Sequence, residues 1–356
     1  MSSGDRIQKL RQELANRDLD GIFVSQPENR YYLSGFDGSA GYLLITAQHA
    51  ILATDFRYVE QAGQQASGYE VFKISGSTED WFPRLLAELD LGRLGFETEH
   101  ITYAVYRQLS DTLNKNQSRL QLVPVDGLVD SLRATKEPEE IELITRAAEI
   151  SDRAIEYFRE IIRPGMTEVA IAWEVEKFLR ENGSQAVPFS AIVASGLNSA
   201  MPHARPSERQ IETGEPVLID IGARFGKYAS DISRTICLGD PDETFNKIYD
   251  IVLGAQLTAL SMIKDGMRGD EADGLAREVI EQAGHGDAFG HSLGHGVGLA
   301  AHERPRLGPN SDEVLTSGMV FTVEPGIYLP GWGGVRIEDL VVMENGGIRL
   351  ISKASK

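Results

Sequence analysis

The sequence predicts a mixed α/β (α+β) fold in two domains, the second of which contains a duplicated unit. Three observations support this prediction. The chain has 356 residues, of which 42% are hydrophobic, and such a length buries a sizeable core and favours two domains. Short apolar runs alternate with helical patterns as far as Val125, and two long stretches of the remaining chain resemble each other. We expect the domains to span residues 1–128 and 136–356.

Five apolar runs in the first domain are typical of short strands. They are Gly21-Ile-Phe-Val, Gly41-Tyr-Leu-Leu-Ile, Ala50-Ile-Leu-Ala, Leu94-Gly-Phe and Leu122-Val-Pro-Val. Helical patterns separate these runs, and the alternation indicates an α/β domain. A boundary follows between Val125 and Thr135. A helix then begins near Pro138, because proline suits the first turn of a helix and the neighbouring acids suit its positive end.

The second domain contains an internal repeat. Ile162-Arg-Pro-Gly-Met and Ile263-Lys-Asp-Gly-Met each precede a predicted helix, and the helices end at Gly183 and Gly284, so both offsets are 101 residues. Further on, Met201-Pro-His-Ala-Arg-Pro matches Ala300-Ala-His-Glu-Arg-Pro. Two copies of one unit should meet about a pseudo-two-fold axis. Three pairs of polar residues would then converge, namely His203 with His302, Asp220 with Glu324, and Asp231 with Glu338.

Asp220 and Glu324 lie within apolar runs that read as buried strands. Burying an unpaired carboxylate costs several kcal/mol or more, so something cationic should face each of them. An arginine or lysine partner, or a strand end in solvent, would explain either acid alone. Their matching places in the repeat favour bound metal instead. Four carboxylates and one imidazole suit two divalent ions, and oxygen-rich ligands favour manganese or cobalt over a structural zinc.

The imidazole that completes this set is His295, in Gly294-His-Gly-Val-Gly, where small neighbours allow a close approach. A phosphate-binding loop is the alternative, but the Gly-Lys-Ser/Thr ending is missing. Five of the seven histidines fall between His203 and His302, a cluster that packing alone explains poorly. Arg336 and Glu338 alternate with apolar residues, so we expect them on one face of a strand. That face would be either a solvated ion pair or part of the site.

A second catalytic motif competes with this interpretation. Gly290-His-Ser-Leu-Gly fits the G-x-S-x-G nucleophile elbow of serine hydrolases. That elbow requires a buried strand before Ser292, yet the preceding residues are polar and rich in glycine. It also requires an acid and then a histidine downstream, and the last histidine, His302, precedes Asp312 and Asp339. We therefore reject a serine hydrolase.

Composition narrows the remaining function classes. The formal net charge of −18 would repel nucleic acid and anionic membranes. No apolar run approaches the roughly 18 to 20 residues needed to span a bilayer, and the first residues lack the layout of a secretory signal. We expect a cytoplasmic protein without nucleic-acid or membrane partners. The single cysteine, Cys237, lies in an apolar run, and we expect a buried structural thiol.

The assembled motifs resemble the Xaa-Pro peptidase branch of the pita-bread metallopeptidases, which includes aminopeptidase P and prolidase. The resemblance covers essentially the whole chain. Its motifs in the second domain are Asp220-Ile-Gly, Tyr228-Ala-Ser-Asp-Ile-Ser-Arg-Thr, Gly294-His-Gly-Val-Gly-Leu, His302-Glu, Glu324-Pro-Gly-Ile-Tyr and Gly334-Val-Arg-Ile-Glu-Asp. In the first domain, Tyr32-Leu-Ser-Gly-Phe-Asp-Gly-Ser-Ala-Gly and Thr54-Asp-Phe-Arg-Tyr resemble the creatinase-like domain of that branch.

The resemblance implies a creatinase-like N-terminal α/β domain followed by a pita-bread catalytic domain. It also implies a role for each site residue. Asp220 would bind one metal, His295 and Glu324 the other, with Asp231 and Glu338 bridging. Glu324 would also be the general base, His203 and His302 would bind substrate and stabilise the tetrahedral intermediate, and His291 and Arg336 would line the pocket. Family members often have glycine after the histidine that matches His203, and here Ala204 follows, which alters the expected pocket edge.

The resemblance further implies two divalent ions, Mn²⁺ first with Co²⁺ or Zn²⁺ as alternatives, peptide substrates that contain proline, and a homodimer. The N-terminal motifs favour an aminopeptidase P that releases the first residue, with prolidase, an Xaa-Pro dipeptidase, as the alternative. A metal-free creatinase-like C–N hydrolase and a non-catalytic peptide-binding module on the same scaffold would lack the ligand set. Methionine aminopeptidase would lack both the N-terminal domain and the feature at Arg336.

Overall fold

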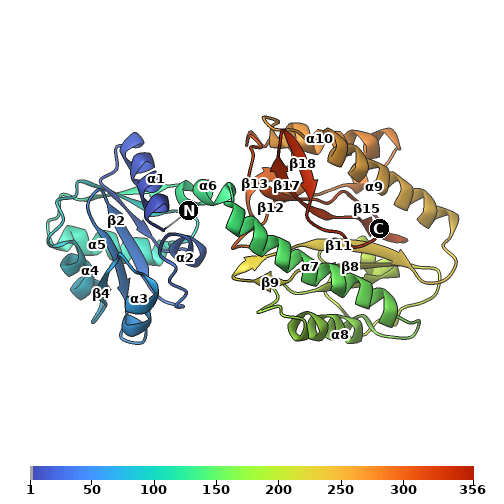
Figure 1. Ribbon diagram of the computed structural model, residues 1–356, viewed down its shortest axis with the longest axis horizontal. Coiled ribbons are helices and arrows are strands. Elements are labelled where there is room, and N and C mark those ends of the chain that lie inside the picture. Colours follow the sequence, from blue (N-terminus) through green and yellow to red (C-terminus); the bar gives the residue numbers. More distant parts are fainter. Residues whose placement is uncertain (1–2) are drawn as a thin grey trace. The chain divides into compact units, whose positions relative to one another are not determined.

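The computed structural model describes residues 3–356, and the chain divides into two compact units, Met1–Arg133 and Ala134–Lys356 (Figure 1). Residues 129–133, which follow the first expected domain, lie in the first unit. Most of them belong to helix α6 (Leu128–Ala134). No helix within residues 3–356 combines the length and the apolar composition needed to cross a membrane.

Within residues 3–133, a mixed sheet of six strands in the order β4-β3-β2-β1-β5-β6 forms the centre of the first unit. The β1–β2 and β2–β3 pairs are antiparallel and the other three are parallel. The strands are β1 (Gly21–Val24), β2 (Tyr42–Thr46), β3 (Ala50–Thr54), β4 (Glu70–Lys73), β5 (Arg93–Glu97) and β6 (Gln121–Val125). The helices that precede α6 are α1 (Ser3–Asn16), α2 (Pro27–Ser34), α3 (Val59–Gln65), α4 (Thr78–Leu86) and α5 (Tyr103–Lys115).

Five of these strands lie where apolar runs predicted them. Strand β4 was not predicted, because its sequence Glu-Val-Phe-Lys is only half apolar and its residues are exposed or half-buried at the sheet edge.

The core on one side of the sheet is aromatic. Phe23 stacks on Tyr42 and on Trp81, with ring centroids 4.7 and 6.4 Å apart, and such pairs add to the free energy that area burial alone supplies.

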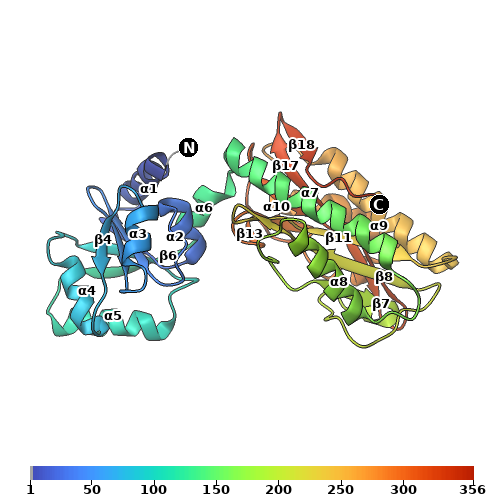
Figure 2. The same cartoon turned by 60° about the horizontal axis from the view of Figure 1, so that its bottom comes forward.

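Two halves of similar architecture build the second unit. Helices α7 (Pro138–Ile161) and α8 (Glu168–Glu181) lie against a sheet of order β11-β8-β7, and α9 (Glu243–Met262) and α10 (Gly269–Gln282) lie against a sheet of order β13-β12-β14-β17-β18 (Figure 2). Helices α8 and α10 both have 14 residues and keep the offset of 101 that the repeat predicted. The duplication is therefore structural.

Within residues 134–356, the two sheets have three and five strands. In the first sheet they are β7 (Ile192–Ser195), β8 (Pro216–Ile221) and β11 (Ile232–Cys237), and in the second β12 (Gly294–Gly296), β13 (Glu303–Leu307), β14 (Val320–Val323), β17 (Asp339–Glu344) and β18 (Gly347–Leu350). Shorter elements are η1 (Gly196–Ala200), β9 (Arg224–Phe225), β10 (Tyr228–Ala229) and η2 (Gly286–Ala288). A hairpin of β15 (Gly326–Leu329) and β16 (Gly333–Arg336) contacts β8 and β11 of the first half.

The expected strand through Arg336 and Glu338 is shorter than predicted. Strand β16 ends at Arg336, and Glu338 lies in the connection before β17. The reason is visible in the hydrogen bonds, because the Glu338 amide donates to the carbonyl oxygen of Ser233 in the first half, at 3.1 Å, instead of joining a ladder of its own half. Asp231 likewise directly precedes β11, and Glu324 directly follows β14. These acids stand where the two sheets meet.

Candidate metal centre and active site

One cavity of about 830 Å³ in the second unit is lined by every residue that the sequence nominated for the site. Both halves contribute to its wall. The nominated residues are His203, Asp220, Asp231, His291, His295, His302, Glu324, Arg336 and Glu338. The convergence that the repeat predicted is thus present in the fold.

The candidate metal ligands approach each other closely around His295. Its Nε2 atom lies 3.4 Å from Glu324 Oε1 and 3.7 Å from Asp231 Oδ2. Asp231, His295 and Glu338 each offer a ligand atom within 4.8 Å of the others. These separations suit ligands that surround a cation and do not bond to one another.

The ring of His295 is oriented with one nitrogen toward the acids. Nδ1 faces the carbonyl oxygen of Gly296 at 3.1 Å, and a carbonyl can only accept, so Nδ1 carries the proton. Burial lowers the pKa of His295, which leaves Nε2 with a lone pair directed at two carboxylates. Such an arrangement is repulsive when the carboxylates are ionised and no cation lies between them and the ring, and a second hydrogen bond that fixes the tautomer is typical of metal-binding histidines.

Glycines on either side allow this strand to approach its neighbours. A Cβ atom at Gly294 would lie 2.0 Å from the carbonyl oxygen of Thr322, and one at Gly296 would lie 2.0 Å from that of Arg304. Real side chains never approach backbone so closely. The glycine-rich motif therefore serves close packing of β12 between β13 and β14, which presents His295 to the cavity.

The environment of the clustered carboxylates disfavours their charged forms. Burial, with repulsion from neighbouring carboxylates, raises the pKa of Asp231 and of Glu338 well above the ordinary value. Burial raises the pKa of Glu324 to about 8. No lysine or arginine within residues 3–356 forms an ion pair with these three acids. Divalent cations would stabilise the deprotonated forms of these acids, since a metal ligand must be deprotonated.

Asp220 has an arginine partner, as the alternative to metal binding anticipated, but only on one side. Its Oδ2 atom accepts a hydrogen bond from Arg336 at 2.6 Å. Its Oδ1 atom is buried and has no hydrogen-bond partner among the described residues. An orphaned buried carboxylate oxygen costs free energy, so this atom also fits a cation.

Arg336 joins the cluster to the side of the cavity that His291 lines. Its buried guanidinium donates to Asp220, to the Tyr328 hydroxyl at 2.8 Å and to Ser233 Oγ at 2.9 Å. The Tyr328 hydroxyl lies 2.9 Å from Nε2 of His291, and Nδ1 of that ring faces the carbonyl oxygen of Ser292. Burial lowers the pKa of His291 to about 4, so the neutral ring accepts from Tyr328.

The two remaining histidines face the same cavity from different halves. His302 stacks on His295 with ring centroids 3.9 Å apart, and burial lowers the pKa of His302 to about 4. His203 lies on an exposed part of the cavity wall. The neutral ring of His302 can therefore donate a hydrogen bond to a bound carbonyl group, and His203 faces the same space.

Several residues around the site were not nominated from the sequence. Thr322 Oγ1 donates to Glu324 Oε1 at 3.1 Å and accepts from the His295 amide. Thr322 and Tyr328 stand two residues before and four after Glu324, so alternation along the strands could have identified them. Arg205 and Arg306 also line the cavity; Arg205 lies within the repeated motif that begins at Met201, whereas no local pattern marked Arg306.

Comparison with known proteins decides the family. A model of metallopeptidase family M24 matches residues 142–345. The chain belongs to this family. The Creatinase/Prolidase N-terminal domain matches residues 6–135, so the resemblance seen in the motifs and the expected fold class are both confirmed. As a member of family M24, the chain is a metal-dependent hydrolase.

Three similar proteins span nearly the whole M24 chain. The Xaa-Pro dipeptidase of Pyrococcus furiosus is 38% identical over 99% of both chains. The structure of an Xaa-Pro dipeptidase from Bacillus anthracis has a TM-score of 0.95 at 43% identity, covering 100% of this chain and 99% of that one. The X-Pro aminopeptidase of Thermotoga maritima has a TM-score of 0.86 at 36% identity, covering 98% of each chain.

Proposed function

We propose that this protein is an Xaa-Pro dipeptidase that holds two divalent cations, manganese first among the candidates. Two of the relatives just described are dipeptidases, and they favour this activity over the aminopeptidase P that the N-terminal motifs favoured. The observation that carries the proposal is a pair of arginines, Arg205 and Arg306, on the wall of a cavity that four carboxylates also line.

The donor set supports a metal pair. Asp220 would hold one ion and His295 with Glu324 the other, while Asp231 and Glu338 would bridge them. Four carboxylates face one buried arginine, so two dications would bring the cluster close to neutrality. Bound divalent ions supply a Lewis acid for the substrate carbonyl and lower the pKa of water.

The side chains around the metal site would move and hold protons. Thr322 Oγ1 donates a hydrogen bond to Glu324 Oε1. Glu324 Oε2 would then take the proton from the attacking water and pass it to the leaving proline nitrogen. His203 and His302 would donate hydrogen bonds to the oxygen that becomes negative in the transition state. Arg336 would hold Asp220 in place through their ion pair.

Recognition of a dipeptide requires a partner for its terminal carboxylate. In Xaa-Pro that carboxylate belongs to the proline, one residue from the scissile bond and within about 4 Å of it along the chain. Arg306 is exposed beside the cavity, and its guanidinium donates to Ser292 Oγ and to the carbonyl oxygen of Pro309 over long distances of 3.3 Å each. Its guanidinium is therefore available for a charge-assisted bond to the substrate.

The test compares alanyl-proline, alanyl-prolinamide and alanyl-prolyl-alanine as substrates. We expect efficient hydrolysis of the dipeptide alone. Arg306→Ala should raise KM for the dipeptide about 10-fold to 100-fold, the value of one charge-assisted bond. Arg304→Ala is the matched control, since this arginine of the same strand pairs with Glu313 and does not line the cavity. Equal turnover of the tripeptide would show an aminopeptidase instead.

Metal content provides an independent test of the same proposal. Protein purified without chelator should contain about two ions of the manganese class per chain. Dialysis against chelator should abolish turnover, and added Mn²⁺ should restore it. A stoichiometry of one at full activity would refute the bridging roles of Asp231 and Glu338.

A further inference from the structure

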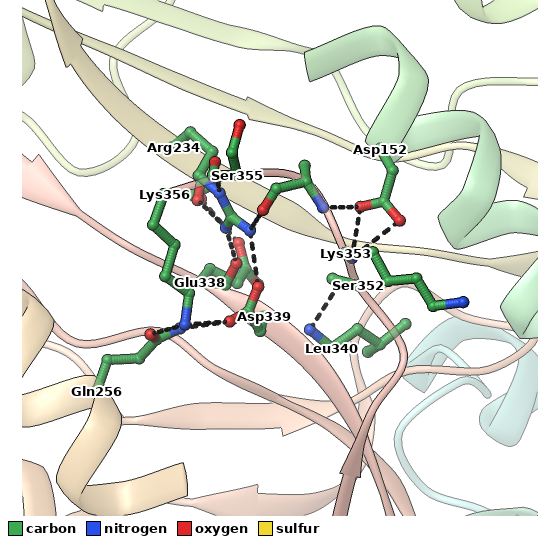
Figure 3. Close-up of polar contacts among 12 residues, drawn as sticks. Asp152, Arg234, Gln256, Glu338, Asp339, Leu340, Ser352, Lys353, Ser355 and Lys356 are labelled. Atoms are coloured by element: carbon green, nitrogen blue, oxygen red, sulfur yellow. Dashed lines mark hydrogen bonds and ion pairs between the residues drawn. The ribbon is translucent and has the colours of Figure 1, made fainter. Parts of the chain in front are cut away.

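Residues 352–356 lie against a buried ion pair next to the candidate metal centre (Figure 3). The pair consists of Arg234 on β11 and Asp339 at the start of β17, with Nη2 and Oδ1 2.8 Å apart. Both side chains are almost fully buried. A buried ion pair is stable only when its remaining donors and acceptors are satisfied, so the partners around it matter.

Segment 352–356 supplies two of the acceptors that Arg234 needs. Nη2 donates to the carbonyl oxygen of Ala354 at 2.6 Å, and Nε donates to that of Ser355 at 2.9 Å. The remaining donors go to Asp339 and, through Nη1, to the carbonyl oxygens of Ser233 and Glu338. All five N–H groups of the guanidinium are thereby used.

The same segment supplies a cation for Asp339. The ammonium of Lys356 lies 2.8 Å from Asp339 Oδ2 and 2.6 Å from Gln256 Oε1, and the amide of Gln256 donates to the same carboxylate oxygen at 3.0 Å. Figure 3 shows the Lys356 side chain directed toward Asp339, whereas the side chain of Lys353 points away from the cluster.

Helix α7 of the first half holds the segment from outside. The carboxylate of Asp152 accepts from the backbone amides of Lys353 and Ala354 at 2.9 to 3.0 Å. Glu156, one turn later, accepts from the amide of Ser355 at 3.1 Å. Segment 352–356 therefore connects a helix of the first half to the start of β17 in the second half.

The contacts of Arg234 lead directly to a candidate metal ligand. The carbonyl oxygen of Glu338 accepts a hydrogen bond from Arg234, and its amide donates to the carbonyl oxygen of Ser233. Its Oε2 atom accepts from Ser233 Oγ at 2.7 Å. Backbone and side chain of Glu338 are thus both fixed by contacts to β11. We propose that segment 352–356, through Arg234 and Asp339, positions Glu338 for metal binding, which rests on the proposed role of Glu338 as a ligand.

Release of the segment would leave two donors of a buried guanidinium without acceptors. The guanidinium would move toward water or toward other acceptors, because unsatisfied buried donors are costly. Any such movement carries the Glu338 carbonyl with it. Partners outside the ligands themselves typically change metal affinity 10-fold to 100-fold, so the effect is measurable without loss of the fold.

Two variants of the full chain release the segment at different points. Asp152→Ala removes the anchor on α7, and Lys356→Met removes the cation at Asp339. Glu160→Ala, at an exposed position on the same helix, and Lys353→Met, with an exposed side chain in the same segment, are the matched controls. Calorimetric titration with Mn²⁺ of protein that a chelator has freed of metal gives the Kd for Mn²⁺. Steady-state kinetics separates kcat from KM.

We expect Asp152→Ala and Lys356→Met to weaken the Mn²⁺ Kd about tenfold and to lower kcat at saturating metal with KM unchanged. Lys356→Arg should retain most of the affinity, and both controls should behave as the unaltered protein. Glu338→Gln separates the two proposals. If it leaves the Kd unaltered, Glu338 is no ligand, and both its proposed ligand role and the positioning role of segment 352–356 fail. If it abolishes binding while Asp152→Ala and Lys356→Met only lower thermal stability, the positioning role is refuted and the ligand role stands.

Discussion

Glu168, on the first turn of α8, holds the chain segment that reaches the cavity at His203. Its side chain is fully buried. Oε1 accepts from the amide and hydroxyl of Ser195 at 2.7 and 2.8 Å, and Oε2 accepts from the amide and hydroxyl of Ser207 at 3.0 and 2.7 Å. Asn198 donates to both oxygens. One carboxylate therefore fixes both ends of segment 195–207.

The substitution Glu168→Gln tests this arrangement, because it keeps the shape and replaces one oxygen with an NH₂ group. Either orientation of the amide turns that NH₂ group toward a backbone N–H, of Ser195 or of Ser207, which cannot accept. A buried donor left unsatisfied costs about 1–3 kcal/mol, and the lost bonds to a charged acceptor add to this. We expect a loss of about 3 kcal/mol in the free energy of unfolding, equivalent to a fall of about 8 °C in Tm.

The activity should fall as well, because the displaced segment carries Pro202, whose carbonyl oxygen accepts from Arg336 at 3.2 Å, and His203. We expect kcat/KM to drop at least tenfold, measured beside thermal unfolding. Glu181→Gln, at an exposed position near the end of the same helix, is the control and should change neither quantity. A Glu168→Gln protein within about 1 kcal/mol of the unaltered one would show that the six hydrogen bonds do not cooperate in holding the segment.

Three further outcomes follow from the site. Glu324→Gln should lower kcat by at least about 100-fold, the contribution of a general base, and near-normal turnover would remove Glu324 from that role. Tyr328→Phe leaves donors and acceptors of Arg336 and His291 unpaired, so kcat/KM should fall about tenfold while circular dichroism stays unchanged. In metal-free protein the pKa of Glu324 is raised from 4.5 to about 8. Near neutral pH the folded state therefore holds a proton on Glu324 that the unfolded chain has released. Stability should therefore fall as pH rises from about 7 to about 8, a range above the titration of unfolded histidines. Saturating Mn²⁺ should abolish this slope in Tm measured by calorimetry, and a metal-free Tm that rises with pH would contradict the raised pKa.

The repeat was the most informative feature of the sequence. Helical periodicity and the matched Gly183 and Gly284 placed α8 and α10 at the same offset in both copies, because such patterns are local and survive duplication. Strands with apolar runs were equally visible. Strand β4 was not, since an edge strand needs no continuous apolar face.

The cavity residues could be nominated because their surroundings were anomalous. Asp220 and Glu324 drew attention as acids within apolar runs, and the structure places both on one cavity wall. The roles of these residues remain a prediction. The contact between Arg234 and Ala354 joins positions 120 apart and has no counterpart in periodicity or spacing, so neither the segment 352–356 nor the cationic edge at Arg306 could be anticipated.

The duplication is unequal at the point where chemistry would take place. Counted from the paired acids Asp231 and Glu338, the position of Arg336 corresponds to Ala229, and counted from Asp220, that of Tyr328 corresponds to Arg224. A cleft with two equivalent walls would admit a peptide head-first or tail-first alike. The guanidinium of Arg336 and the phenol of Tyr328 come from the second half alone, so the two directions of a bound backbone differ in energy. An enzyme that is specific for one chain end can therefore arise from a symmetric ancestor.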